Sequence, residues 1–89
     1  MNEELDRFKL IVDLEGFSLT WLAEETGIKR QRWADVKNGR AKMLLTEGAA
    51  VSKLFPEYAY WLTTGEEIVE VGQISPLTKR AHKNYETAD

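Results

Sequence analysis

The sequence contains no cysteine, and its only histidine is His82. Without cysteine the chain can form no disulfide, no thiolate metal site and no cysteine nucleophile. His82 lies in a polar C-terminal stretch with no second metal ligand close to it in the sequence, so we expect an exposed residue and no metal site.

Long apolar runs are also missing. No segment approaches the roughly 18 apolar residues that span a bilayer, and the N-terminus, MNEELDRF, is acidic and lacks the apolar core of a secretion signal. With 89 residues, of which 43% are hydrophobic and 30% charged, the chain suits one domain with a modest core. We therefore expect a soluble cytoplasmic protein with no membrane partner.

The usual features of an enzyme are absent from the sequence. There is no phosphate-binding glycine loop, and the acidic pairs Glu24–Glu25 and Glu66–Glu67 consist of adjacent residues. Adjacent side chains on a helix point in different directions, so these pairs are unsuited to shared acid–base chemistry. We expect no enzymatic activity, no cofactor and no small-molecule ligand.

Positive charge is concentrated in one short segment. Residues 29–42 carry six basic side chains against the single acid Asp35, whereas the whole chain has a net charge of −3. A basic run on a helix is usually only a solvated face, so it needs support from its surroundings. Because charges act within a Debye length of about 8–10 Å, this segment can attract a polyanion although the chain as a whole is acidic.

Apolar spacing and helix-boundary signals predict an all-α fold. Ser18 is expected to cap one helix and Gly27 to end it, while Thr46 and Pro56 are expected to begin two later helices. The segment EEIVEV (66–71) alternates loosely and predicts a short strand or an extended arm. The expected helices are 3–15, 19–26, 29–38, 47–54, 56–64 and a tail helix at 75–86.

Residues 19–38 have the spacing of two short helices joined by a tight turn. Ala23 is small enough to let the helices approach closely, and Gly27, four residues later, suits the turn. The second helix has only a narrow apolar stripe, formed by Trp33 and Val36. Its wide remaining face is polar and basic, as expected of a helix offered to the DNA major groove.

The three tryptophans are expected to differ in burial. Trp33 is expected in the core, as are Trp61 and Leu62, which would close the domain over the first helix. Trp21 is expected on the outer side of its helix, where the tail could cover it.

This pattern resembles the lambda-repressor/Cro-type helix-turn-helix family. The resemblance is carried by LAEETGI (22–28) followed by RWADVKNGRAKM (32–43), and PEYAYWLTTGEE (56–67) is similar to the element that closes the DNA-binding domain of many phage-type repressors. It implies a five-helix lambda-repressor-like DNA-binding domain over residues 1–67 and a C-terminal arm or tail, 68–89, as a candidate dimerisation element. It also implies a phage- or prophage-type transcriptional regulator, most simply a repressor, in the bacterial cytoplasm and on the nucleoid when bound.

Three positions depart from the family pattern. Leu19 stands where the family often has glutamine, so one contact to the DNA backbone is missing there. Thr26 occupies a position that is usually more apolar. Trp33 is larger than the usual valine or isoleucine, which predicts a shifted packing angle between the two helices.

The resemblance implies which residues contact bases. Arg30 and Gln31 are the leading candidates, because arginine can pair with guanine O6 and N7 and glutamine with adenine N6 and N7. Ala34 could meet a thymine methyl group. Asp35 could accept a hydrogen bond from cytosine N4, or could instead orient Gln31 or Arg32. The residues expected on the DNA backbone are Ser18, Thr20, Lys29, Arg32, Lys37, Asn38, Arg40 and Lys42.

A single helix-turn-helix buries little DNA surface, so we expect a homodimer on a pseudo-palindromic operator, with recognition helices about 34 Å apart. The sequence does not identify the dimer surface, and the candidates are the 56–64 helix, the EEIVEV segment and the tail helix. An alternative function is a protein–protein interaction module of antitoxin or adaptor type. Its acidic flanks and the apolar residues of IVEV would then serve a protein partner.

Overall fold

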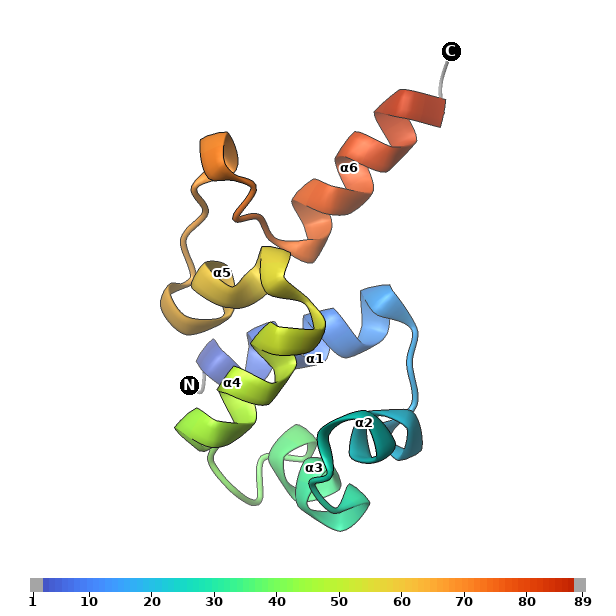
Figure 1. The fold of residues 1–89 in the computed structure, drawn as a ribbon, viewed down its shortest axis with the longest axis vertical. Coiled ribbons are helices and arrows are strands. Elements are labelled where there is room, and N and C mark those ends of the chain that lie inside the picture. Colours follow the sequence, from blue (N-terminus) through green and yellow to red (C-terminus); the bar gives the residue numbers. More distant parts are fainter. Residues whose placement is uncertain (1–2, 88–89) are drawn as a thin grey trace.

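The computed structural model describes residues 3–87 and confirms the all-helical class (Figure 1). Five of the expected helices keep their places with small shifts at the ends, and the sixth, at 56–64, starts as a 3-10 turn. The elements are α1 (Glu3–Glu15), α2 (Leu19–Thr26), α3 (Arg30–Lys37), α4 (Leu45–Leu54), the 3-10 turn η1 (Pro56–Tyr58), α5 (Ala59–Thr64), the 3-10 turn η2 (Val69–Val71) and α6 (Pro76–Thr87).

Helices α1 to α5 enclose one apolar core. Its centre contains the rings of Phe8 from α1 and Trp33 from α3, which stack with their centroids 5.5 Å apart. Trp61 and Leu62 of α5 are also buried, as expected. Trp21 packs against Phe17 at a centroid distance of 5.1 Å, and 37% of the residue remains exposed.

The boundaries of α2 follow local chemistry. The hydroxyl of Ser18 accepts a hydrogen bond from the Trp21 N–H at 3.0 Å, which confirms the expected cap. Gly27 ends the helix with φ of 73°, a left-handed conformation that suits glycine, and its N–H donates to the Ala23 carbonyl at 2.9 Å. The next helix therefore starts at a fixed angle to α2.

One expected helix start is wrong, and one expected helix is divided although it begins at Pro56 as expected. Thr46 does not cap α4: the helix begins at Leu45, and the Leu44 N–H donates to the carboxylate of Glu47 at 2.7 Å. The Glu47 carboxylate thereby satisfies the N–H of the residue that precedes the helix, as the acid of a capping box does. The expected 56–64 helix is divided into η1 and α5.

The EEIVEV segment is neither a strand nor an extended arm. It forms η2, closed by a single antiparallel bridge in which the Ile68 N–H donates to the Gln73 carbonyl at 2.8 Å. The Gln73 amide then donates to the Pro56 carbonyl at 3.0 Å and accepts from the Tyr60 N–H at 2.9 Å. These contacts fold the segment back onto the start of α5.

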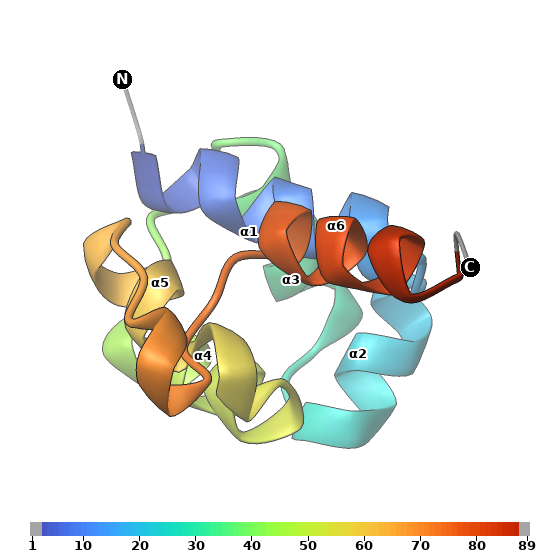
Figure 2. The ribbon, with the colours of Figure 1, turned by 90° about the horizontal axis from the view of Figure 1, so that it is seen from above.

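The tail helix α6 is joined to the body at its first turns. The Lys79 ammonium group bridges Glu15 at 3.1 Å and Glu57 at 2.8 Å, and it lies over the ring of Tyr58. Beyond this attachment the helix rises away from the body, at the opposite end of the molecule from α3 (Figure 1). Seen from above, it runs alongside α1 (Figure 2).

Candidate nucleic-acid interface

Helices α2 and α3 contain eight residues each and are joined by a tight turn of three residues. The turn contains Gly27, Ile28 and Lys29, and the Ile28 N–H donates to the hydroxyl of Thr26 at 3.3 Å. Such a turn leaves the start of α3 free to meet a ligand.

The inner side of α3 is anchored by Trp33 and Val36, which are 0% and 1% exposed. The indole N–H of Trp33 donates to the Thr26 hydroxyl at 3.1 Å, and that hydroxyl donates to the Leu22 carbonyl at 2.7 Å. A buried indole N–H needs an acceptor, and threonine at 26 supplies one. Thr26 and Trp33, two of the three residues expected to depart from the resembled pattern, are thus hydrogen-bonded to each other.

The outer side of α3 presents the expected base-contacting residues. Arg30 and Gln31 are exposed in the first turn, and Ala34 and Asp35 are half-buried one turn further on. The Gln31 amide donates to the Asp35 carboxylate at 3.0 Å, and the Arg40 guanidinium lies 3.9 Å from the same carboxylate. Asp35 therefore holds Gln31 in place, which was one of the two roles left open for it.

Arg32 has a different environment from the other cations of the segment. Its guanidinium forms a two-pronged ion pair with Glu47 of α4, and it also donates to the Lys42 carbonyl at 2.7 Å. The side chain of Glu47 is only 4% exposed, against 32% for Arg32. These bonds make Arg32 a link between α3, the following loop and α4.

Burial and hydrogen bonding act in opposite directions on Glu47. Burial by itself raises the pKa of this carboxyl, but the hydrogen bonds from Arg32 and from the Leu44 N–H outweigh it and hold the pKa below its ordinary value. Glu47 is thus an ionised, buried partner. Sequence reasoning missed it, because an acid at the third position of a helix signals a cap and not a tertiary contact.

The remaining residues expected on the DNA backbone lie around this helix. Ser18, Thr20, Lys29, Asn38, Arg40 and Lys42 are exposed, and Lys37 is half-buried. The loop after α3 is held by the Asp35 carbonyl, which accepts from the Arg40 N–H at 2.8 Å and from the Ala41 N–H at 3.2 Å. The backbone of the loop that carries Arg40 is therefore held against the end of α3.

No protein-family model, curated protein or solved structure matches this chain. Within residues 3–87, every helix is too short or too polar to cross a bilayer. The described part of the chain also holds no group of three or more histidine, cysteine, aspartate or glutamate side chains arranged around a metal ion. The assignment of a function must therefore come from the geometry around α3.

Proposed function

We propose that the protein is a sequence-specific double-stranded DNA-binding transcriptional regulator that inserts α3 into the major groove. One observation carries this proposal: Arg30 and Gln31 stand exposed at the start of a short helix whose opposite side is locked into the core by Trp33. A helix fits the B-DNA major groove, where each base pair presents a distinct pattern of donors and acceptors.

The side-chain chemistry at this helix start suits base recognition. Arg30 makes no hydrogen bond or ion pair with any other described residue, so its guanidinium is available to a guanine edge. Gln31 gives one amide hydrogen to Asp35, which leaves the other hydrogen and the carbonyl oxygen for adenine N7 and N6. Asp35 acts as a positioning residue in this scheme.

The phosphate contacts come from the cations that flank α3. Lys29 precedes the helix, Lys37 is its last residue, and Arg40 and Lys42 lie in the loop that follows. The Ser18 hydroxyl uses its oxygen as the helix cap, so its hydrogen can be donated to a phosphate. Each phosphate contact contributes about −0.9 to the log–log salt slope, so four cations predict a slope of about −4 per subunit.

One DNA-binding unit buries little DNA surface, and two further parts of the proposal follow from this. The regulator binds as a homodimer to a pseudo-palindrome, which places two α3 helices about 34 Å apart on one side of the duplex. A bound dimer blocks other proteins at its site, so repression is the simplest outcome.

The competing function is a protein-interaction module. It is favoured by Val69 and Val71 on η2, which are 47% and 69% exposed beside the acidic residues 66, 67 and 70. A protein partner at η2 predicts little or no affinity for duplex DNA at low salt.

Selection of bound sequences from a random duplex pool tests the proposal, followed by fluorescence anisotropy on the selected and scrambled sites. We expect Arg30→Ala and Gln31→Ala to abolish the preference for the selected site while leaving weak, salt-dependent binding. Arg80→Ala is the matched control, because Arg80 is an exposed cation on α6. Unchanged preference in the α3 variants, or no enrichment at all, would contradict the proposal.

A further inference from the structure

A second surface of the molecule is left unexplained by DNA binding. Three consecutive apolar residues, Met43–Leu45, lead into α4, and Leu44 and Leu45 are 55% and 90% exposed. Single exposed leucines are common on protein surfaces, but a run of apolar residues beside a hollow is not. We call this surface, together with the hollow next to it, the Leu45 face.

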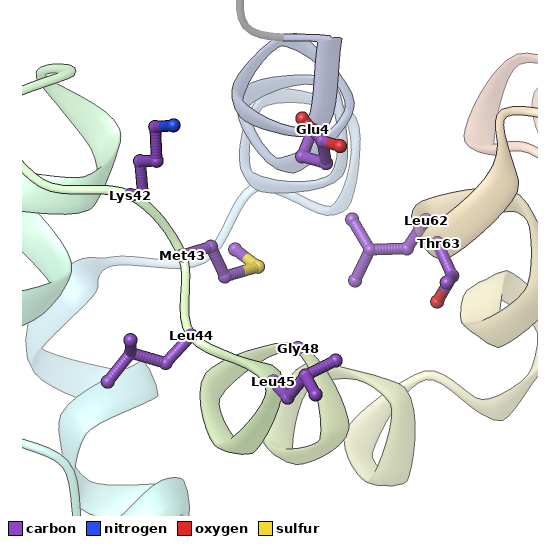
Figure 3. Close-up of a pocket in the computed structure, with 8 residues that line it drawn as sticks. All are labelled: Glu4, Lys42, Met43, Leu44, Leu45, Gly48, Leu62 and Thr63. Atoms are coloured by element: carbon purple, nitrogen blue, oxygen red, sulfur yellow. The ribbon is translucent and has the colours of Figure 1, made fainter.

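The hollow of the Leu45 face has a volume of about 620 Å³. The Met43 side chain extends into the hollow, and Leu62 and Thr63 of α5 form its far wall. Gly48, which has no side chain, also lines it (Figure 3). A protruding leucine therefore lies directly beside an apolar recess on the same face.

The rim of the hollow carries one charge of each sign. Glu4 of α1 and Lys42 of the loop before α4 both line it, and neither side chain forms an ion pair with another described residue. In Figure 3 these two residues lie on one side of Met43, and Leu44 and Leu45 lie on the other.

We propose that the Leu45 face is where a second copy of this chain docks. A two-fold axis lying in this face and passing over Met43 sets Lys42 opposite Glu4 of the partner subunit, and Leu44 opposite the partner's Leu45. A two-fold interface uses the same patch on both subunits, so it requires such internal complementarity. A partner of one charge would leave either Glu4 or Lys42 facing a like charge.

This interface would join the two subunits of the homodimer in the proposed function, on which it rests. Its formation does not require DNA. Through Leu62 and Thr63 the Leu45 face overlaps one of the three dimer surfaces expected from the sequence, the 56–64 helix. It is separate from the other two, the EEIVEV segment and the tail helix. The inference also assigns Lys42 to the subunit contact, which leaves three cations for phosphates and lowers the expected salt slope from about −4 to about −3 per subunit.

Sedimentation velocity over about 1–200 μM protein, without DNA, tests the interface. We expect the unchanged protein to dimerise and Leu45→Glu to weaken the dimer about tenfold or more, because it places a charge at the centre of the contact. Leu77→Glu is the matched control, since Leu77 is a leucine that is 57% exposed on α6. It is expected to dimerise normally.

Charge reversal supplies the second measurement. Lys42→Glu and Glu4→Lys should each weaken the dimer, and the double variant should restore it. Arg30→Ala should dimerise normally although it loses DNA preference, which separates this inference from the proposed function. A monomeric protein at the highest concentration, an undisturbed Leu45→Glu dimer, or no rescue in the double variant would each overturn the interface.

Discussion

At the scale of single residues, the most informative contact is the one between Thr26 and Trp33. An indole fills the space between α2 and α3 completely, and the hydroxyl of Thr26 satisfies its N–H. The large ring and the polar neighbour therefore depend on each other. Replacing either Thr26 or Trp33 alone would make the packing of α2 against α3 less stable.

We predict that Thr26→Val destabilises the protein by about 1–3 kcal/mol, because it keeps the side-chain shape but leaves a buried N–H without an acceptor. Urea unfolding measured by tryptophan fluorescence gives the free energy. Thr20→Val, at an exposed position of the same helix, should stay within about 0.5 kcal/mol of the unchanged protein. Equal stability of the two variants would show that the hydroxyl does not support Trp33.

At the scale of helices, the contact between Arg32 and Glu47 joins α3 to α4. Glu47 is ionised in the folded protein with a lowered pKa. Its stabilising effect is therefore present above the ordinary pKa of a glutamate, about 4.3, and is lost as the pH falls through the lower folded value. The orientation of α3 in the bundle depends on that charge.

We predict that Glu47→Gln is less stable than the unchanged protein at pH 6, and that the difference shrinks as the pH is lowered to 3. The reason is that protonation removes from the unchanged protein the same charge that the substitution removes. Denaturant unfolding at a series of pH values measures the difference, and Glu24→Gln, at an exposed carboxylate of α2, is the control. A difference that stays constant with pH would contradict the charged pairing.

Much of this architecture could be predicted from the sequence, because it depends on local signals. The bounds of α1 and α2 follow from apolar spacing, Ser18 and the glycines, and the exposure of Gln31 follows from the helical period that buries Trp33 and Val36. These features need no knowledge of other elements.

The remaining features depend on contacts between distant residues. The start of α4 depends on Glu47, whose partner Arg32 lies fifteen positions earlier in the sequence. The turn at η2 is fixed by Gln73, which bonds to Pro56 and Tyr60. A loosely alternating segment of six residues contains no information about such partners.

At the scale of the whole molecule, charge is distributed by region. The cations at and after α3 face one end of an otherwise acidic protein, and they lie on the surface. This asymmetry would orient the protein toward a polyanion as the two approach, and its effect would weaken as salt is added.

We predict that Arg40→Ala weakens binding to the selected and scrambled duplexes by the same factor and makes the log–log salt slope smaller in magnitude by about 1, because the proposed function assigns Arg40 to a phosphate and not to a base. Anisotropy titrations at three or more salt concentrations measure both quantities. A loss confined to the selected site would instead place Arg40 among the base contacts.

The position of α6 has a practical consequence. The molecule is elongated, with extents of 42 × 23 × 23 Å, and α3 and α6 occupy its two ends (Figure 1). A fluorophore or a surface tether attached at Ala81, an exposed residue of α6, would therefore sit far from α3. Immobilised in this way, the protein would keep its cationic end free in solution for kinetic measurements.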